Sequence, residues 1–460
     1  MRSTRWLAIA MLLPLLPAVA KGQRQWTLDE CMDYALAHNM ELKHLQNEQK
    51  RREITAQASK DARLPRFSGD VYGIDATIHH SGDGNKFDSN ASLIDMGLTG
   101  VVPLYTGNRL ASQIKADKYS LMAAEEDVHA AERRVRVQVA AAYLQMLYDK
   151  GEASIVRQQQ EVSQMLLKRA RSLFDKGKRP ESDVVEAAAM VSRDEALLVA
   201  AEGDIALARL DLRQLLNLPD SVDFDICEPT DSLDATPLVQ SDEYYAQTAF
   251  RHPAVQSANY SILQAEQGVK AARSGYFPTL SLIGELGTFW ANIDTKTTVS
   301  GLLSMPVPLD RLGSFPYRLS GETEGKWKNF FQGIVGLQLS IPVFNAFETK
   351  ARIRTAKVNL EDAKLALQDA RLHIQKDIRQ AWQGAVTAHK RYEAEVKAEE
   401  ASALAYRYAL KRYDAGMATL FDLSQSRQQW FSASENALRM KYEYLIRKRI
   451  LDIITQSPLP

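Results

Sequence analysis

The sequence predicts a mainly α-helical protein with a smaller β part, built from two copies of one structural unit. Three observations support this prediction: an internal repeat, helical spacing of apolar residues over very long segments, and short segments with period-two alternation. The repeat appears when the second half is shifted back by 239 residues, which places residues 102–105 (VPLY) on 341–344 (IPVF) and residues 174–177 (FDKG) on 413–416 (YDAG). A repeat of this length indicates a duplicated supersecondary unit rather than a short-period solenoid.

The chain begins with the features of a secretory signal peptide. Residues 1–5 are basic, residues 6–17 are apolar, and residues 18–20 (AVA) have the small side chains of a cleavage site. We therefore expect residues 1–20 to be removed on export. No other stretch approaches about 18 consecutive apolar residues, so the mature chain is predicted to lack a transmembrane helix.

Composition excludes some classes of partner. The 460 residues contain 57 Lys and Arg against 57 Asp and Glu, so the charge balance gives no support for a nucleic acid partner. The two cysteines, Cys31 and Cys227, lack the spacing of a metal site, and a disulfide between them in an oxidising compartment stays open.

Each repeat is predicted to contain a long helical hairpin, over about 107–216 in repeat 1 (21–216) and about 347–455 in repeat 2 (247–460). Apolar residues follow a three-four spacing in both copies, which is typical of a helix packed against another helix. The spacing breaks at Gly177 and Gly416, which predicts a tight turn in each hairpin. At 1.5 Å per residue, the first helix would be roughly 100 Å long, far more than a globular domain requires.

Strands are predicted over about 67–104 and about 279–344, where apolar residues alternate with polar residues or glycine in segments near ten residues long. This pattern is typical of strands in outer-membrane barrels, and a half-buried soluble sheet is the alternative. Four strands cannot enclose a lumen, and an open edge in lipid leaves unsatisfied backbone groups that cost several kcal/mol each. If these strands lie in a membrane, several chains must therefore share one barrel.

Two irregular segments complete the chain. Residues 291–329 are rich in Gly, Ser, Pro and charge and are predicted to form a long extracellular loop, with a periplasmic insertion as the alternative. Residues 217–246 contain three prolines and are predicted to be a linker between the repeats, at the waist of the helical part.

Several motifs in order resemble the TolC-type outer-membrane efflux protein family, the outer membrane factors. They are residues 26–39 (WTLDECMDYALAHN), their second-half counterpart 250–255 (FRHPAV), the strand starts Leu64-Pro65 and Phe277-Pro278, and the second tip, 416–422. The resemblance covers the whole mature chain. It implies a homotrimer in which each subunit gives four strands to a shared twelve-stranded outer-membrane β-barrel, continuous with a periplasmic α-barrel of coiled-coil hairpins.

The same resemblance implies a function. Such channels are passive exit ducts in the outer membrane of Gram-negative bacteria, and they dock on a periplasmic adaptor (membrane fusion) protein and an inner-membrane pump of the RND or ABC type. The cargo, whether drug, metal ion, bile-salt-like amphiphile or protein, is chosen by the pump and is not written in this sequence. A soluble periplasmic coiled-coil adaptor or scaffold is the alternative, but two equivalent hairpins and four amphipathic strands argue against it.

The chain departs from the family pattern in three places. The residue after the cleavage site is Lys21 and not cysteine, so acylation is not expected. The first tip, 176–180 (KGKRP), is more basic than the apolar tips of many relatives. Relatives that close the periplasmic end with a basic residue two places after the second tip glycine would have it at Ala418, so that lock is absent here.

The predicted adaptor-docking surface consists of Gly177, Lys178, Gly416 and Met417. Both glycines stand where the helical pattern breaks, which suits a residue with positive φ that ends a helix. A bare backbone also permits close approach of a partner. The alternative is that these glycines only end their helices.

The predicted periplasmic aperture consists of Asp183, Asp422 and Tyr413. Each aspartate is six residues past its tip glycine, in the first turn of a returning helix, where threefold symmetry would make a ring of carboxylates. Such rings attract cations and repel one another, unless Tyr413, Lys178 or Arg179 bonds across the tips. The alternative is that both aspartates only interact with the helix dipole and cap free amides.

No enzyme is predicted. The sequence has no phosphate-binding loop and no paired catalytic constellation, so no catalytic residue and no cofactor are expected. His79 and His80 beside Asp83 are expected to be solvated at a strand end, and no metal site is predicted.

Overall fold

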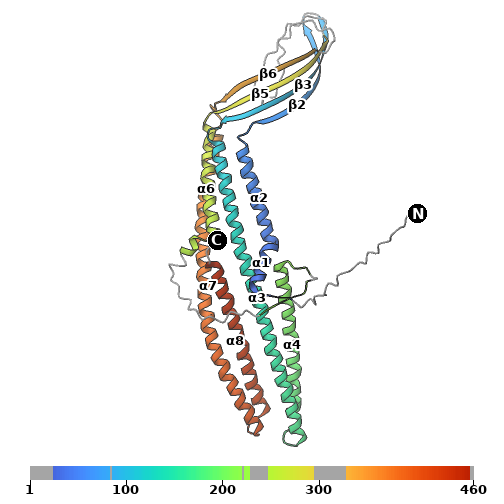
Figure 1. Ribbon diagram of the computed structural model, residues 1–460, viewed down its shortest axis with the longest axis vertical. Coiled ribbons are helices and arrows are strands. Elements are labelled where there is room, and N and C mark those ends of the chain that lie inside the picture. The colour runs from blue at the N-terminus through green and yellow to red at the C-terminus, as the bar shows by residue number, and fades with distance from the viewer. Residues whose placement is uncertain (1–23, 83–84, 220–221, 228–246, 295–327, 456–460) are drawn as a thin grey trace, which may run out of the picture. The chain divides into compact units, whose positions relative to one another are not determined.

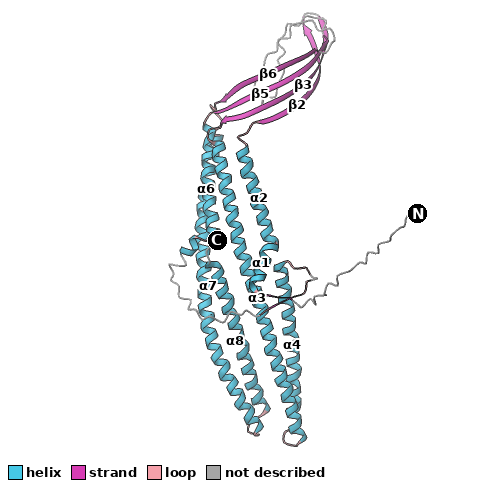
Figure 2. Cartoon of the chain, viewed as in Figure 1, coloured by secondary structure: helices cyan, strands magenta, loops and turns pink. Residues whose placement is uncertain are grey.

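The computed structural model of the chain describes residues 24–82, 85–219, 222–227, 247–294 and 328–455. The predicted signal peptide lies outside these residues, as do most of the predicted linker and most of the predicted extracellular loop. The described residues are mainly helical (Figure 2), and their strands form one four-stranded and one two-stranded sheet. The prediction of a mainly α-helical protein with a smaller β part is confirmed.

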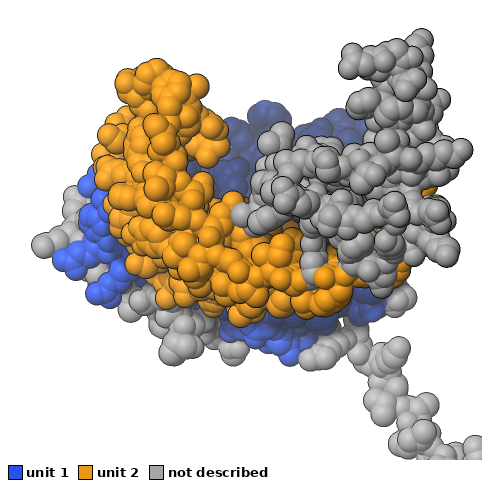
Figure 3. Space-filling model, turned by 90° about the horizontal axis from the view of Figure 1, so that it is seen from above, with its two compact units in different colours: residues 1–47, 126–256, 369–460 blue, residues 48–125, 257–368 orange. Residues whose placement is uncertain are grey.

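The chain forms two compact units, coloured separately in Figure 3. Unit 1 comprises residues 1–47, 126–256 and 369–460, and unit 2 comprises residues 48–125 and 257–368. Four helices contribute residues to both units: α2 (Met40–Asp61), α3 (Arg109–Asp175), α6 (Pro253–Arg273) and α7 (Glu348–Asp414). None of the described helices is long and apolar enough to cross a bilayer.

Unit 1 is dominated by two helical hairpins, α3 with α4 (Glu181–Leu216) and α7 with α8 (Leu420–Thr455) (Figure 1). Helices α3 and α7 both have 67 residues, and α4 and α8 both have 36. Each second-half helix begins 239 residues after its first-half counterpart, since 348 − 109 and 420 − 181 are both 239. Along α3, a seam of buried residues follows the helical spacing that the sequence showed: Val128, Ala131, Val135 and Val139.

In a second part of unit 1, the residues before α1 pair with a segment that follows α4. Strand β1 (Arg24–Trp26) pairs in parallel with β4 (Phe224–Ile226). The buried hydroxyl of Tyr143 donates to the carbonyl oxygens of Trp26 and Cys227, at 3.0 and 2.6 Å. Helix α1 (Leu28–His38) begins at a capping box, in which Thr27 and Glu30 bond each other's backbone N–H. Cys31 and Cys227 are both free thiols in this structure.

The four-stranded sheet lies in unit 2 and is antiparallel throughout, in the order β2-β3-β5-β6. Its strands are β2 (Arg66–Gly82), β3 (Asn85–Tyr105), β5 (Thr279–Asp294) and β6 (Lys328–Ser340) (Figure 1). Among the described residues, β2 and β6 each have one edge without a partner strand. The 3-10 turn η1 (Ser274–Tyr276) leads from α6 into β5.

The strands are 13 to 21 residues long, so the expected length near ten residues was too short. In the β2–β3 hairpin, pairing continues from Arg66↔Val101 to Gly82↔Asn85, through a polar region that includes His79↔Asp88. Backbone pairing needs no apolar side chain, so strands extend beyond the part that the hydropathy pattern marks. His79 and His80 consequently belong to a strand and not to a loop at a strand end.

Candidate functional site

The two hairpin tips, residues 174–183 and 413–423, contain all the residues that the sequence analysis selected. Both tips belong to unit 1, and one cluster of buried side chains supports them: Leu166, Ala170, Ala187, Met190, Tyr406, Tyr413, Leu420 and Leu423. Since this cluster includes residues of α3, α4, α7 and α8, the two hairpins share one core beneath their tips.

Gly177 and Gly416 end α3 and α7 in the left-handed conformation, with φ of 66° and 77°. The backbone N–H of Lys178 bonds the carbonyl of Leu173, and that of Met417 bonds the carbonyl of Arg412, which is the Schellman arrangement of a helix end. A Cβ atom added at either glycine would meet no heavy atom within 4 Å. Conformation, and not lack of space, therefore requires glycine at both tips.

The exposed surfaces of the two tips differ in chemistry. Lys178 is exposed at the first tip, beside Lys176. Met417 is 72% exposed and Phe421 is 65% exposed at the second tip. Phe421 was not among the predicted docking residues, although an aromatic residue at a helix start beside a tip loop was visible in the sequence. The loop of the first tip therefore exposes lysine side chains, whereas the second tip exposes large apolar side chains.

Arg179 connects the two tips within one chain. Its guanidinium donates to the carbonyl oxygens of Tyr413 and Ala418, at 3.2 and 2.8 Å, and it lies over the Tyr413 ring at 4.7 Å from the centroid. These are charge-assisted hydrogen bonds combined with a cation–π contact. Ala418 is the position where relatives that close with a basic residue would carry it, and in this chain the cation at this place comes from the other hairpin.

Asp183 of the first hairpin and Tyr413 of the second are in contact. Tyr413 is 1% exposed, and its hydroxyl donates to Oδ2 of Asp183 at 3.4 Å. Burial raises the pKa of Tyr413, and the Asp183 carboxylate raises it further. The tyrosine therefore stays protonated and remains a donor at neutral pH.

Asp422 is not part of this contact. It lies in the first turn of α8, exposed, and its carboxylate accepts bonds from the backbone N–H and the hydroxyl of Thr419 at 2.9 and 2.8 Å. The N–H of Asp422 in turn donates to the Thr419 hydroxyl at 3.1 Å. These bonds, the backbone bond first, hold the pKa of Asp422 below its usual range. Asp422 thus caps its own helix, and the sequence pattern T-x-x-D already carried that signal.

A buried ion pair above the tips was missed. Arg427 of α8 bonds Asp194 of α4 at 2.7 Å, with the side chains only 7% and 0% exposed. Gln159 of α3 donates its amide to the other Asp194 oxygen at 2.7 Å. Each charged residue stands in a row of buried apolar residues; in α8, Arg427 follows Leu420 and Leu423 at helical spacing. A charge at such a position in the sequence could have indicated a buried ion pair.

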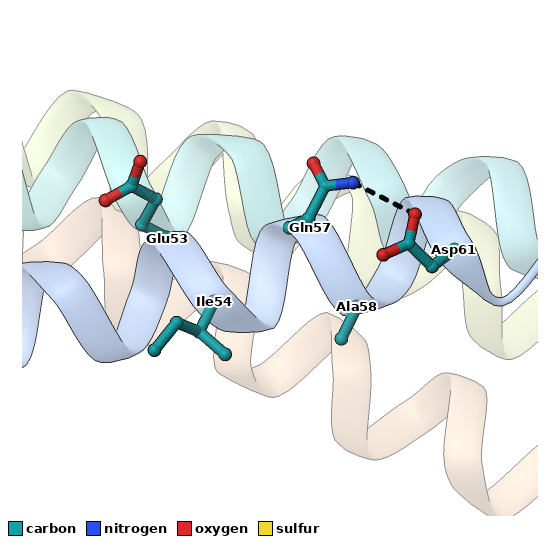
Figure 4. Close-up of a pocket in the computed structure, with 5 residues that line it drawn as sticks. All are labelled: Glu53, Ile54, Gln57, Ala58 and Asp61. Carbon is teal, nitrogen blue, oxygen red and sulfur yellow. Dashed lines mark hydrogen bonds between the residues drawn. The ribbon is translucent and has the colours of Figure 1, made fainter.

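The described residues offer little for a small ligand. A shallow depression is lined by five residues of α2 alone, as Figure 4 shows: Glu53, Ile54, Gln57, Ala58 and Asp61. A hydrogen bond from the Gln57 amide to Asp61 spans it at 2.9 Å. No group of three or more His, Cys, Asp or Glu residues suited to a metal ion occurs in the described ranges.

Known proteins with a similar sequence or fold are outer-membrane efflux proteins and channels. Residues 32–218 and 245–454 match the family described as outer membrane efflux protein. The outer membrane efflux protein BepC of Brucella suis biovar 1 (strain 1330) is 23% identical over 322 residues, which are 70% of this chain and 62% of that protein. The chain therefore spans less than two thirds of the length of this relative.

Solved structures show the same fold. The outer-membrane channel OprN has a TM-score of 0.75 at 18% identity, covering 94% of this chain and 90% of that one. CusC has a TM-score of 0.76 at 16% identity, covering 99% of both chains. The CmeC outer membrane channel of Campylobacter jejuni has a TM-score of 0.74 at 20% identity, covering 93% of this chain and 85% of that one.

Proposed function

Because the chain belongs to the outer membrane efflux protein family, we propose that it forms the exit duct of a tripartite efflux or secretion system. The protein is located in the outer membrane with a periplasmic part, and it is a transport protein rather than an enzyme. In the proposed system it is a passive channel that docks on a periplasmic adaptor protein and an inner-membrane pump of the RND or ABC type.

The observation that carries this proposal is the four-stranded sheet with two open edges. On β3, Ile94, Met96 and Leu98 are exposed apolar residues, and they alternate with less exposed polar or glycine positions. An apolar row suits lipid, whereas the open edges of β2 and β6 do not, because lipid offers no hydrogen-bond partner. Three copies that pair β6 of one with β2 of the next would close a twelve-stranded barrel.

The helical part supports a second half of the proposal, a periplasmic tube of paired hairpins. The equal lengths of α3 and α7, and of α4 and α8, support the hypothesis of a duplicated unit. Three subunits with two hairpins each would give six hairpins around one axis. We place residues 217–246 at the waist of this tube and residues 291–329 on the extracellular side.

The assembly is tested by native mass measurement of the protein in mild detergent. We expect a trimer that stays intact while the strands remain folded by circular dichroism. Monomers with folded strands would contradict the proposal of a shared barrel, because the open edges of the sheet would then be stable without a neighbouring subunit.

We further propose that Gly177, Lys178, Gly416 and Met417 form the docking surface for the adaptor. Exposed Met417 and a bare backbone at φ 77° support this role, since a partner can approach the tip closely. Replacing Gly416 by tryptophan should abolish efflux in cells while trimer and abundance are retained. Loss of the trimer itself would show that Gly416 only ends its helix.

The third element of the proposal is a periplasmic aperture formed by Asp183, Asp422 and Tyr413. The Tyr413–Asp183 bond and the Arg179 bridge support a closed resting state, because they hold the two tips of one chain together. Single-channel recording separates aperture from capping: we expect Asp183→Asn to weaken cation preference. If Asp422→Asn changes only stability, capping is the whole role of that carboxylate.

A further inference from the structure

The segment between β6 and α7, residues 341–347 (IPVFNAF), carries an unusual concentration of exposed large apolar side chains. Val343 is 94% exposed, Phe344 76% and Phe347 66%, and Val343 is the most exposed large hydrophobic residue among those described. None of the three belongs to a buried cluster. A surface of this kind in a folded protein indicates contact with a partner or a membrane.

The backbone that presents these side chains adopts a conformation that they disfavour. Ala346 and Phe347 have φ of 49° and 62°, in the left-handed region that residues other than Gly and Asn rarely adopt. The equivalent turn before α3 has the same two φ signs, but it uses Gly107 and Asn108, which tolerate them. The first turn thus has suitable residues, and the second has an alanine and a bulky aromatic. Such a conformation persists at places where it has a use.

The two aromatic rings are ordered against each other without being buried. Phe344 and Phe347 meet edge to face, with centroids 5.7 Å apart and planes at 85°. The ammonium group of Lys350, in the first turn of α7, lies 5.7 Å from the Phe347 centroid. The result is an aromatic pair with a cation at its edge, open to the surroundings.

This pair continues the apolar face of β6. Every second residue from Phe331 to Val343 is a large apolar residue, with Gly333 as the exception, and all of these large residues are more than half exposed. The row passes the end of the strand at Ser340 and reaches the aromatic pair. If β6 faces acyl chains, the pair lies at the next level, where the lipid headgroups begin.

We propose that Phe344, Phe347 and Lys350 form an anchor in the headgroup layer of the periplasmic leaflet, with the rings at the acyl boundary and the ammonium at the lipid phosphates. This proposal rests on the proposed function, in which the sheet spans the outer membrane. Aromatic side chains at that level and a cation facing phosphate match the chemistry of a phospholipid interface. The strained turn keeps both rings on the lipid side.

The anchor is tested by depth-dependent fluorescence quenching on the full trimer in phospholipid vesicles. An environment-sensitive fluorophore is attached to the cysteine of the Phe347→Cys variant. The vesicles contain lipids that carry a nitroxide quencher either on the headgroup or near the end of the acyl chain. The parent protein, treated in parallel, gives the background of Cys31 and Cys227. Leu365→Cys is the matched control, because Leu365 is also exposed on α7 but lies about 27 Å further along that helix.

We expect the headgroup nitroxide to quench position 347 about twofold or more strongly than the acyl-chain nitroxide, and neither to quench position 365. Quenching of position 347 by aqueous iodide alone would overturn the anchor. Protection from both lipid and iodide would show that a second copy of the chain covers the pair. Phe344→Cys repeats the test if Phe347→Cys fails to fold.

Two further variants keep the proposal separate from its premise. A fluorophore on Val335→Cys of β6 should be quenched by the acyl-chain nitroxide. If it is not quenched, the proposal that the sheet spans the membrane is wrong. If position 335 is quenched and position 347 is not, only the proposal of the anchor is wrong. The double variant A346G/F347N copies the first turn. This variant keeps the two positive φ angles but removes the Phe347 ring, so in that background we expect headgroup quenching at Phe344→Cys to fall by about half, and unchanged quenching would remove Phe347 from the anchor.

Discussion

Arg179 makes the contact that decides how the two tips of one chain are held. It brings a cation from the first hairpin to the Ala418 backbone of the second, the position at which relatives that close with a basic residue would carry it. Its two bonds to carbonyl oxygens end on backbone atoms, so no substitution at Tyr413 or Ala418 removes both acceptors. The sequence identified Arg179 as a bridging candidate but gave no information on its acceptors, because these depend on how the hairpins pack.

We predict that Arg179→Ala separates the tips. It removes two charge-assisted hydrogen bonds and a cation–π contact worth about 0.5 to 2 kcal/mol. Spin labels at the exposed positions Lys178→Cys and Met417→Cys report the separation by pulsed electron resonance. Arg179→Lys is the control, since it keeps the charge but loses the planar fork. The same distance distribution in Arg179→Ala as in the parent would show that the buried core alone fixes the tips.

Asp149 of α3 gives a prediction on pH. Its carboxyl is buried, and this burial, together with the nearby carboxylates of Glu152 and Asp204, raises its pKa to about 6, although a bond from Gln145 opposes the shift. A raised acid pKa means that the folded protein gains stability as pH falls through 6 toward the unfolded value. Asp149→Asn should therefore raise the free energy of unfolding by about 1 to 3 kcal/mol at pH 7 and have little effect near pH 4.

The measurement is chemical unfolding of parent and variant at several pH values in the same detergent. The gap between the two curves should close between pH 7 and pH 4. A gap that stays constant would mean that the substitution acts through packing and not through the charge.

At the scale of helices, a tip glycine and an interior glycine with free space around it should respond to alanine with opposite sign. Gly416 has φ of 77°, so Gly416→Ala should destabilise the protein by about 1 to 2 kcal/mol. Gly203 lies exposed inside α4, where an added Cβ meets nothing within 4 Å, so Gly203→Ala should stabilise by about 0.5 to 1 kcal/mol. Thermal unfolding of the two variants measures both signs in one protein. Equal shifts in one direction would contradict the helix-end role of Gly416.

The Arg427–Asp194 pair sets how α8 packs on α4. Breaking a buried pair leaves one uncompensated charge, and we expect Asp194→Leu to lower the free energy of unfolding by about 3 to 5 kcal/mol. The double variant Asp194→Leu with Arg427→Met should recover most of this loss, since an apolar pair can fill the same place. A double variant as unstable as the single one would mean that the attraction between Arg427 and Asp194 stabilises the hairpins, and that the loss in the single variant does not come from an uncompensated buried charge.

For the molecule as a whole, the sequence predicted local features better than contacts between segments. Helical spacing and the tip glycines depend on neighbouring residues, so the helical fold and the turn positions were readable. Strand lengths were underestimated because polar residues such as those near His79 pair through their backbone alone. The Arg427–Asp194 contact joins residues 233 apart, and only the packed hairpins bring them together.

The two open strand edges have a consequence for genetics. If the chain forms the proposed trimer, a subunit with a defective tip still offers intact β2 and β6 edges and enters the same trimers as the normal subunit. In a cell that makes both in equal amounts, roughly one trimer in eight would contain normal subunits only. A tip variant such as Gly416→Trp should then be dominant over the wild-type gene, whereas a variant that prevents strand pairing should be recessive.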